Sequence, residues 1–449
     1  MKVFGSSGTR GVVNEELTPG FVLDVAKAAG TLWGADRVAV ARDTRATGRM
    51  LANAATAGLQ AVGSDVDRLG VVPTPGTQVY CEEEGVPAMM ITASHNPPEY
   101  NGVKLVGPDG IELSVDELER VENVFLGDGY ETVAWDETGD DRAVEDARRR
   151  YTDQLIDAVD TDRIRDADLT VAIDPGHGAG ALTSPDFYRE LGCEVVTVNS
   201  QPDGRFPGRD PEPIEENLAD LGRLVGAADA DVGIAHDGDA DRAIFFDETG
   251  TYVEGDAALA ALAAAELSEG DTAVSAVNVS QRLVDVCEDA GASLDLTPVG
   301  STRIMTRIRQ LHAEGETVPV AGEGNGGIIF PNYRLTRDGA YTGARFLELL
   351  ADSPASEVVE PYADYWNVRV NVPYDSESDR ERILGAAEEY ARDADADLTT
   401  VDGYRLDYGD AWVLARPSGT EPVVRVYAEA TSADHARDLA DAFADAIEP

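Results

Sequence analysis

Three aspartates stand at alternate positions in one short stretch of the chain, Asp237, Asp239 and Asp241. Carboxylates this close repel one another unless a cation binds them, and hard oxygen ligands in a tight loop suit Mg²⁺. A calcium-binding EF-hand is a rival interpretation because Glu248 stands at the twelfth position of the run, but Arg242 occupies the sixth, where that loop needs glycine. A chance cluster in an acidic chain is the plainer alternative. Apolar residues on both sides predict strand, loop and strand, which favours a magnesium site.

Ser94 follows another apolar run and precedes a polar loop, in the sequence TASHNP. A serine at the end of a buried strand is well placed to act as a nucleophile. His95 is adjacent in sequence, so it could serve as the base only with a special backbone bend. The G-x-S-x-G motif of many serine hydrolases is absent around Ser94. If Ser94 instead carries a phosphoryl group, a neighbouring Mg²⁺ would offset its charge, and the serine and the acidic loop together predict phosphoryl transfer.

Basic side chains must overcome the acidic field of the chain wherever an anionic ligand binds. In the segment RPSGTEP, the backbone amides of Ser418, Gly419 and Thr420 could cradle a phosphate beside the fork of the Arg416 guanidinium. Surface ion pairing is the alternative for the arginines. The basic candidates for binding substrate or phosphate are Arg10, Lys104, Arg242, Arg303, Arg416 and Arg425.

A glycine-rich run, GEGNGG, covers residues 322–327. It does not match a P-loop, because no Gly-Lys-Ser/Thr follows, and it does not match a dinucleotide motif, because the next residues predict a strand. Glu323 is placed to accept hydrogen bonds from sugar hydroxyls.

One unit of strand, turn, helix, glycine and strand recurs at residues 37–63, 169–192 and 272–291. Such units predict largely parallel sheets, and ligands of open α/β sheets bind beyond the carboxyl ends of strands. Each copy reaches a further apolar run that stops at one of the polar loops above. We therefore expect an α/β protein with three related α/β domains of mixed, largely parallel sheets and a C-terminal α+β domain, around a central cleft. The expected boundaries are 1–152, 153–253, 254–364 and 365–449.

The composition limits the partners of the chain. Asp and Glu number 85 against 36 Lys and Arg, which gives a net charge of −49 over 449 residues. This field disfavours nucleic acid or an anionic membrane as the main partner. The N-terminal residues have no apolar signal core, so a soluble, cytoplasmic protein is expected. Cys81, Cys193 and Cys287 are far apart and predict buried free thiols. Monomer and dimer both stay open.

The acidic residues are spread along the whole chain, which favours adaptation to high salt over a dedicated acidic surface. At about 1 M salt the screening length is only ~3 Å, so self-repulsion of this size becomes tolerable. We expect the fold to loosen when salt is removed. Thermal unfolding followed by circular dichroism checks this: the midpoint should fall at low ionic strength, and an unchanged melt would count against the adaptation.

Taken together and in order, the four loops resemble those of the α-D-phosphohexomutase superfamily, which includes phosphoglucomutase/phosphomannomutase and phosphoglucosamine mutase. TASHNP resembles its phosphoserine loop, DGDADR its metal loop, GEGNGG its sugar loop and RPSGTEP its phosphate loop. The resemblance covers essentially the whole chain. It implies four domains around a cleft, a catalytic Mg²⁺ and a sugar 1,6-bisphosphate that acts as intermediate and activator.

The resemblance also implies roles for individual residues. Ser94 would be phosphorylated and would bind Mg²⁺ with Asp237, Asp239 and Asp241. Arg242 would contact the phosphoserine, and Arg10 and Lys104 would assist proton transfer, Lys104 being the better base because arginine stays charged. Glu323 and Asn325 would hold sugar hydroxyls. The phosphate that does not react would lie on Arg416, Ser418, Gly419 and Thr420.

The sugar loop departs from the common pattern of the family, Glu-x-Ser-Gly-His. Here Asn325 replaces the serine and Gly327 replaces the histidine. Any proton-transfer role of that histidine must therefore move elsewhere or vanish.

The function expected is a Mg²⁺-dependent phosphohexomutase that interconverts hexose 6-phosphate and hexose 1-phosphate of the glucose/mannose type. A phosphoglucosamine mutase or a phosphopentomutase of the same family is the alternative. A metal-dependent sugar phosphatase is more distant. A non-catalytic phosphosugar sensor needs neither Ser94 nor the complete aspartate triplet.

Overall fold

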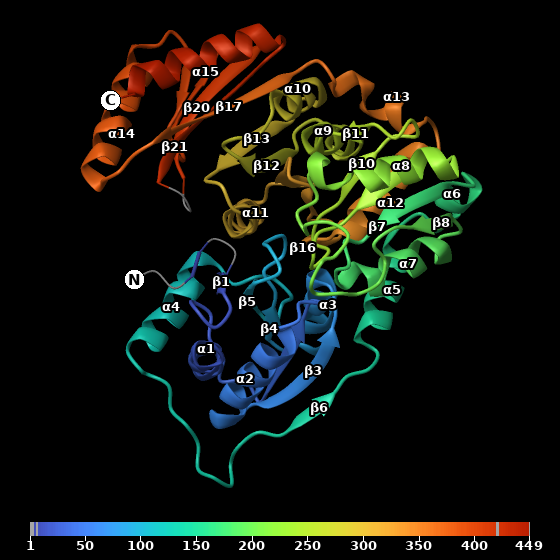
Figure 1. The fold of residues 1–449 in the computed structure, drawn as a ribbon, viewed down its shortest axis with the longest axis vertical. Helices are drawn as coiled ribbons and strands as arrows, with labels where there is room; N and C mark the ends of the chain where they lie inside the picture. Colours follow the sequence, from blue (N-terminus) through green and yellow to red (C-terminus); the bar gives the residue numbers. More distant parts are fainter. Residues whose placement is uncertain (1–3, 6–7, 419–421, 449) are drawn as a thin grey trace.

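The first sheet of the protein carries the Ser94 loop. The computed structural model describes residues 4–5, 8–418 and 422–448, and the chain is folded into four sheets (Figure 1). The first sheet has the strand order β1-β5-β4-β2-β3-β6. Its elements are β1 (Thr9–Val12), α1 (Pro19–Trp33), β2 (Arg37–Arg42), α2 (Gly48–Ala61), β3 (Asp65–Val71), α3 (Thr74–Glu84), β4 (Ala88–Ile91), β5 (Tyr100–Val106), α4 (Val115–Leu126), β6 (Asp141–Ala143) and α5 (Ala147–Ala158).

The second sheet carries the acidic loop, and its order is β11-β10-β9-β7-β8. Its strands are short and apolar and are covered by helices. Its elements are α6 (Thr161–Asp166), β7 (Thr170–Asp174), η1 (Ala179–Leu182), α7 (Ser184–Glu190), β8 (Glu194–Thr197), η2 (Glu215–Asn217), α8 (Ala219–Ala228), β9 (Val232–Ala235), β10 (Ile244–Phe246) and β11 (Tyr252–Val253).

The third sheet carries the glycine-rich loop, and its order is β13-β12-β14-β15-β16. Its elements are α9 (Gly255–Glu266), β12 (Thr272–Ala276), α10 (Gln281–Ala290), β13 (Ser293–Thr297), α11 (Ser301–Glu314), β14 (Ala321–Glu323), β15 (Gly327–Phe330), β16 (Arg334–Arg337), α12 (Gly339–Leu350), α13 (Ala355–Val359) and η3 (Glu360–Tyr362).

The three sheets share one arrangement of strands. In each, two parallel strands joined by a crossover (β2 and β3, β7 and β8, β12 and β13) lie beside a third parallel strand (β4, β9, β14). The third strand then pairs antiparallel with the next strand of the chain. This confirms the expected α/β class and the repeated unit. The Ser94, Asp237–Asp241 and sugar loops all connect the same pair of strands in their respective sheets.

Buried apolar strands and capped helices explain why these segments fold as they do. The four central residues of β2 are buried, as expected for a strand covered on both faces. The side chain of Thr18 caps α1, and Ser114 with Glu117 forms a capping box at α4. The second and third sheets share one apolar core, in which Phe245 of β10 stacks on Phe346 of α12 with ring centroids 4.2 Å apart.

The C-terminal sheet is antiparallel, with the order β17-β21-β20-β19-β18, which confirms the α+β prediction. Arg405 donates to the carbonyl oxygens of Val277 and Val279 at 2.8 and 3.0 Å, so this sheet is bound to the segment that follows β12. The elements are β17 (Trp366–Pro373), α14 (Glu377–Asp393), β18 (Asp397–Thr399), β19 (Tyr404–Asp407), β20 (Ala411–Pro417), β21 (Val423–Ala430) and α15 (Ala433–Ile447).

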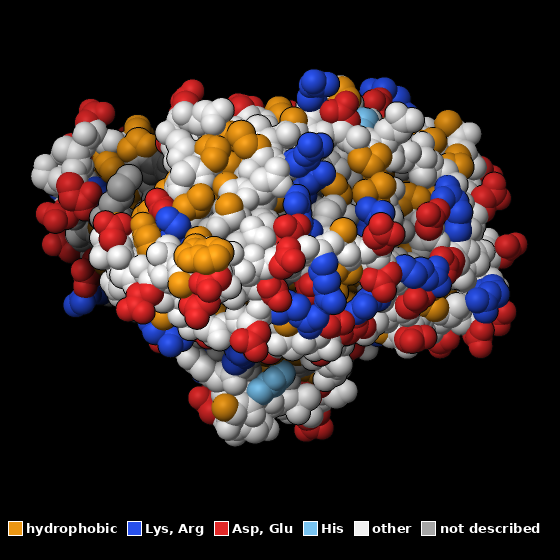
Figure 2. Space-filling view, turned by 90° about the horizontal axis from the view of Figure 1, so that it is seen from below, with side chains coloured by type: hydrophobic (Ala, Val, Ile, Leu, Met, Phe, Trp, Pro, Cys, Tyr) orange, Lys and Arg blue, Asp and Glu red, His pale blue; other side chains and the backbone are white. Residues whose placement is uncertain are grey.

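Acidic side chains are scattered over the whole face seen in Figure 2 and are interspersed with basic ones. They do not gather into one patch on that face. In the described part of the chain, no helix combines the length and the apolar composition required to cross a membrane. Cys81, Cys193 and Cys287 are buried free thiols, as expected.

Candidate active site

Two loops that are far apart in sequence meet at Ser94. The Ser94 hydroxyl donates a hydrogen bond to Asp237 Oδ2 at 2.6 Å. The loops pack so closely that a Cβ added to Gly238 would lie 2.6 Å from the Ser94 carbonyl oxygen. Thr74, the first residue of α3, adds a third contact, because its backbone N–H donates to the Asp239 carbonyl at 2.9 Å. The structure therefore brings the candidate nucleophile and the acidic loop together.

The backbone of the Ser94 loop is held in an unusual shape. Ser94 has φ 51°, in the left-handed region that L-residues with a Cβ rarely adopt, and its N–H donates to Thr92 Oγ1 at 2.8 Å. The buried Arg45 donates to the carbonyl oxygens of Ser94, Asn96, Pro97 and Tyr100 and pairs with Asp43. Neither Arg45 nor Asp43 stood out in the sequence, because their partners lie about fifty positions away.

His95 contacts both the serine and a neighbouring cation. The bend at Ser94 places the serine Oγ 3.1 Å from His95 Nδ1, and Arg242 Nη2 lies 3.0 Å from the same nitrogen. Burial and the charges of Arg242 and Arg10 lower the pKa of His95 well below its ordinary value. The imidazole is therefore neutral, and its Nδ1 accepts a hydrogen bond from Arg242, because the single Ser94 hydroxyl proton is donated to Asp237. The backbone bend that a Ser94–His95 contact requires is present.

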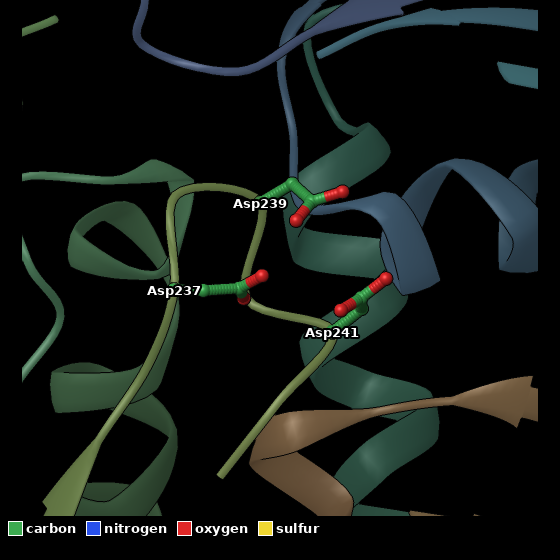
Figure 3. A group of neighbouring side chains, drawn as sticks. All are labelled: Asp237, Asp239 and Asp241. Carbon is green, nitrogen blue, oxygen red and sulfur yellow. The ribbon is translucent and has the colours of Figure 1, made fainter. Parts of the chain in front are cut away.

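The three aspartates form the group of side chains that could hold a metal ion. All three are buried, and one oxygen from each lies within 4.8 Å of the oxygens from the others (Figure 3). Each Oδ2 has a partner in the protein, whereas each Oδ1 is buried without one among the described residues. Three unpartnered carboxylate oxygens in one small space fit Mg²⁺, which takes hard oxygen ligands.

Four cations surround this triplet and set its electrostatics. Lys104 Nζ lies 2.9 Å from Asp241, 3.2 Å from Asp239 and 3.4 Å from Glu112. Burial opposes the charge on Lys104, but these carboxylates outweigh burial and raise its pKa above the ordinary value. Lys104 is therefore an ammonium group bound to the acidic loop. The other cations of the group are Arg10, Arg242 and Arg337.

The triplet divides into one carboxyl with a raised pKa and two with lowered values. Burial, followed by the charges of Asp239 and Asp241, raises the pKa of Asp237. Burial is also the largest single effect on the other two. The lowering effects of Lys104, Thr74, Arg337 and Arg10 together outweigh it at Asp239, and those of Arg337, Lys104 and Arg242 together outweigh it at Asp241, so both pKa values are lowered. Asp239 also accepts from the Thr74 hydroxyl at 2.6 Å.

Arg10 and Arg242 both contact side chains of the serine loop. Arg10 donates to Asn96 Oδ1 at 2.8 Å, and burial together with the nearby charge of Arg242 lowers its pKa. Arg242 follows the acidic loop directly and its Nε stands 3.9 Å from Asp237 Oδ2. Both predicted cations are thus placed beside Ser94.

The glycine-rich loop borders a small cavity of about 100 Å³. Glu323 and Asn325 line it together with Asp256, at the start of α9. The Asn325 side chain accepts from the Gly327 N–H at 3.0 Å, so it also shapes the loop. Arg337, which the sequence analysis did not single out, lies against Gly327 and binds Asp241.

The RPSGTEP segment joins β20 to β21. The strand ends that flank it face α11 and β1 (Figure 1). Arg416 stands opposite Arg425 in the ladder and donates to Asp402 at 3.0 Å, and the Ser418 N–H donates to the Val423 carbonyl at 2.9 Å. Gly419 and Thr420 lie outside the described residues.

Arg303 lies apart from the acidic loop. It stands in the first turn of α11 and lines a small cavity with Phe4 and with side chains of α4. The structure therefore places it between α11 of the third domain and α4 of the first.

The serine hydroxyl comes from the first of four domains and the buried acidic triplet from the second, and the first three domains repeat one topology. This arrangement is matched by a family of phosphosugar mutases. The chain belongs to the phosphoglucomutase/phosphomannomutase family. The α/β/α domains I, II and III of that family match residues 1–130, 149–250 and 254–365, and its C-terminal domain matches residues 367–446. The protein is therefore a phosphohexomutase.

Relatives match along nearly the whole chain. A phosphoglucomutase/phosphomannomutase from Thermococcus kodakarensis is 40% identical over 97% of this chain and 96% of the relative. A probable phosphoglucosamine mutase from Methanopyrus kandleri is 41% identical over 99% of this chain and 98% of the relative. Two relatives that are about equally identical to this chain are thus named for different sugar phosphates.

Solved structures share the fold. A phosphoglucomutase/phosphomannomutase family protein from Burkholderia thailandensis has a TM-score of 0.86 at 28% identity, covering 99% of this chain and 96% of its own. An N-acetylphosphoglucosamine mutase from Aspergillus fumigatus, described in complex with GlcNAc-6P and magnesium, has a TM-score of 0.60 at 16% identity, covering 99% and 95%. The second likeness extends to the fold alone.

Proposed function

We propose that the protein interconverts hexose 6-phosphate and hexose 1-phosphate through phospho-Ser94 and a bisphosphorylated sugar. The observation that carries this proposal is the 2.6 Å hydrogen bond from Ser94 Oγ to Asp237 inside a buried acidic triplet. In the proposed cycle the bond between phosphorus and Ser94 Oγ breaks as the free substrate hydroxyl attacks, which gives a sugar 1,6-bisphosphate. The bisphosphate turns over, and its other phosphoryl group returns to Ser94.

Asp237, Asp239 and Asp241 would hold Mg²⁺ together with an oxygen on Ser94. The three buried Oδ1 atoms without a partner among the described residues support this assignment. When bound, the ion would offset the negative charge that develops on the transferring group. Asp237 positions the Ser94 oxygen, and Arg242 and His95 border the place where the phosphoryl group would stand.

The hydroxyl proton of the substrate needs an acceptor. Lys104 was the preferred base from sequence, but its ion pairs hold it as ammonium, so it must leave Asp239 and Asp241 before it can accept a proton. Its supported role is to keep the acidic loop in place. Arg10 has a lowered pKa and fewer direct ion pairs, and it stands beside the serine loop. We therefore propose Arg10 as the group closer to the attacking hydroxyl.

The rest of the substrate would extend toward the sugar loop and the C-terminal domain. Glu323 and Asn325 would accept hydrogen bonds from sugar hydroxyls. The phosphate that does not react would lie on Arg416 and Ser418, together with Gly419 and Thr420, with Arg425 beside them. Backbone donors suit this task because the two ends of the substrate exchange places between half-reactions.

One observation favours an amino sugar as a second candidate substrate. The cavity beside the sugar loop is lined by the carboxyl groups of Asp256 and Glu323, and a protonated amino group on the sugar would pair with them. Burial raises the pKa of Asp256 to about 7, and a cationic amino group beside it would favour the ionised form. The relative from Methanopyrus kandleri named for glucosamine phosphate is consistent with this candidate. Glucose and mannose phosphates remain the first proposal.

A parallel assay on glucose, mannose, glucosamine and ribose 1-phosphates, at high salt with Mg²⁺ and added sugar bisphosphate, tests the proposal. We expect isomerisation of at least one hexose phosphate, stimulation by the bisphosphate and no stoichiometric release of inorganic phosphate. Phosphate release that matches substrate loss would instead establish the phosphatase. Asp256→Asn separates the sugars: if the amino sugar is bound as above, kcat/KM for glucosamine 1-phosphate should fall about tenfold more than that for glucose 1-phosphate.

A further inference from the structure

Gly327 and Arg337 occupy neighbouring positions on one face of the third sheet. β15 and β16 are antiparallel, and Ile329 stands opposite Arg337. Side chains two positions apart on a strand share a face, so position 327 lies beside Arg337. A Cβ built on Gly327 would be 2.8 Å from Arg337 Cδ and 3.4 Å from its Nη1. The backbone of Gly327 lies outside the left-handed region, so the Arg337 side chain, with the nearby Asn325 amide oxygen, is what excludes a side chain at this position.

The guanidinium of Arg337 spans the distance from the sugar loop to the metal loop. Its Nη2 binds Asp241 Oδ2 at 2.5 Å, and its Nη1 lies toward Gly327. Among the described residues its Nε and Nη1 have no hydrogen-bond partner, although the side chain is only 7% exposed. Burial opposes its charge, but Asp241, Glu112 and Glu323 together raise its pKa. Arg337 is therefore a permanent cation with donors to spare at the centre of the site.

The neighbours of Arg337 fix its strand independently of any ligand. The Thr336 hydroxyl donates to Gln78 of α3. Asp338 accepts from the Tyr151 hydroxyl at 2.7 Å and caps α12. Arg334 Nε pairs with Glu82 of α3 at 2.5 Å. The end of β16 is thus anchored to the first domain, and the Arg337 side chain enters the site from a rigid support.

We propose that Arg337 is a substrate-binding residue that uses the space left by the absent side chain of Gly327. Its free Nε and Nη1 donors are directed at phosphate or hydroxyl oxygens of the sugar phosphate, while its Nη2 binds the metal loop. This inference rests on the proposed function, because it places the sugar phosphate between the two loops. It places the permanent charge of an arginine beside position 327, where the common family pattern Glu-x-Ser-Gly-His has its histidine.

Arg337→Gln should change the affinities for metal and for phosphosugar in opposite directions. Removing a positive charge beside Asp241 strengthens the attraction of the triplet for a divalent cation, so Mg²⁺ alone should bind about threefold or more tightly by calorimetry. Glucose 1,6-bisphosphate, titrated in the presence of Mg²⁺ in a Ser94→Ala background that prevents transfer, should bind about tenfold or more weakly. Arg337→Lys keeps the charge and should leave the Mg²⁺ affinity within about twofold of wild type.

Two further variants keep the proposal testable if Arg337→Gln folds poorly. Gly327→Ala places a methyl group against Arg337 Cδ and should weaken bisphosphate binding, as Arg337→Gln does. The double variant Gly327→Ala/Arg337→Gln should bind the bisphosphate no more weakly than Arg337→Gln alone. Arg307→Gln is the control. It removes an arginine that pairs with Asp295 in the same domain, and it should change neither the Mg²⁺ affinity nor the bisphosphate affinity.

The proposal would be overturned if Arg337→Gln weakened the binding of both Mg²⁺ and the bisphosphate, or changed neither affinity. Additive losses of bisphosphate affinity in the double variant would also overturn it. Isomerisation by the wild-type enzyme is measured separately. Failure of the Arg337 predictions in an enzyme that isomerises hexose phosphates therefore overturns only the role of Arg337.

Discussion

Replacing Ser94 with alanine is expected to reduce isomerisation by at least about a thousandfold, because the phosphoryl group then has no oxygen on the protein to which it can return. The change removes one buried oxygen and the hydrogen bond to Asp237, and leaves the rest of the loop in place. Arg45 holds that loop through backbone carbonyls, so its shape does not depend on the serine side chain. Steady-state turnover of the preferred hexose 1-phosphate, with saturating bisphosphate, measures the effect.

Ser184→Ala is the matched control for this variant. Ser184 is a buried serine in the second domain, and its hydroxyl has no hydrogen-bond partner among the described residues. Its replacement should leave turnover near that of the wild type. Substantial activity in Ser94→Ala, with both variants folded by circular dichroism, would remove the phosphoserine from the mechanism.

The second large effect is expected at the acidic loop. Asp239→Asn should weaken Mg²⁺ binding about tenfold to a hundredfold and reduce turnover at fixed Mg²⁺ by a similar factor, with part of the activity recovered at high Mg²⁺. The amide keeps the size of the side chain but removes one of the charges that bind the cation. It also places a neutral group beside Lys104, 3.2 Å away in the native protein, so Lys104 then pairs more strongly with Asp241. Calorimetry with Mg²⁺ alone and turnover against Mg²⁺ concentration give the two readouts.

Asp229→Asn controls for the loss of one negative charge in the same domain. Asp229 is exposed and has φ 52°, a conformation that asparagine adopts readily, so stability and Mg²⁺ affinity should stay unchanged. Removal of metal provides an independent check, because excess chelator should abolish turnover of the wild type. Undiminished activity in chelator would contradict a metal role for the triplet.

Local patterns predicted much of the fold. Apolar runs such as Ala88–Ile91 and Val232–Ala235 read as buried strands because each is short and bounded by polar loops. The repeated unit placed the serine, metal and sugar loops after equivalent strands, and the structure has them there. Residues of unusual type and spacing, such as Asp237, Asp239 and Asp241, could therefore be recognised without coordinates.

The supporting residues could not be found in this way. Thr74 and Arg337 are 165 and 96 positions from the aspartates that they bind, and neither lies in a motif. Arg45 acts through backbone carbonyls, which leave no mark on the sequence of the loop that it holds. The protonation state of Lys104 was also beyond the sequence, since it depends on three carboxylates that only the fold brings within 3.4 Å.

Transfer of phosphate to and from Ser94 can be measured directly. The purified enzyme is incubated with glucose 1,6-bisphosphate labelled with ³²P, digested and analysed by mass spectrometry, and a second sample is chased with unlabelled hexose phosphate. We expect label on the peptide that contains Ser94 and its transfer back to sugar during the chase. Label on another residue, or a phospho-Ser94 that the sugar cannot discharge, would contradict the proposed mechanism.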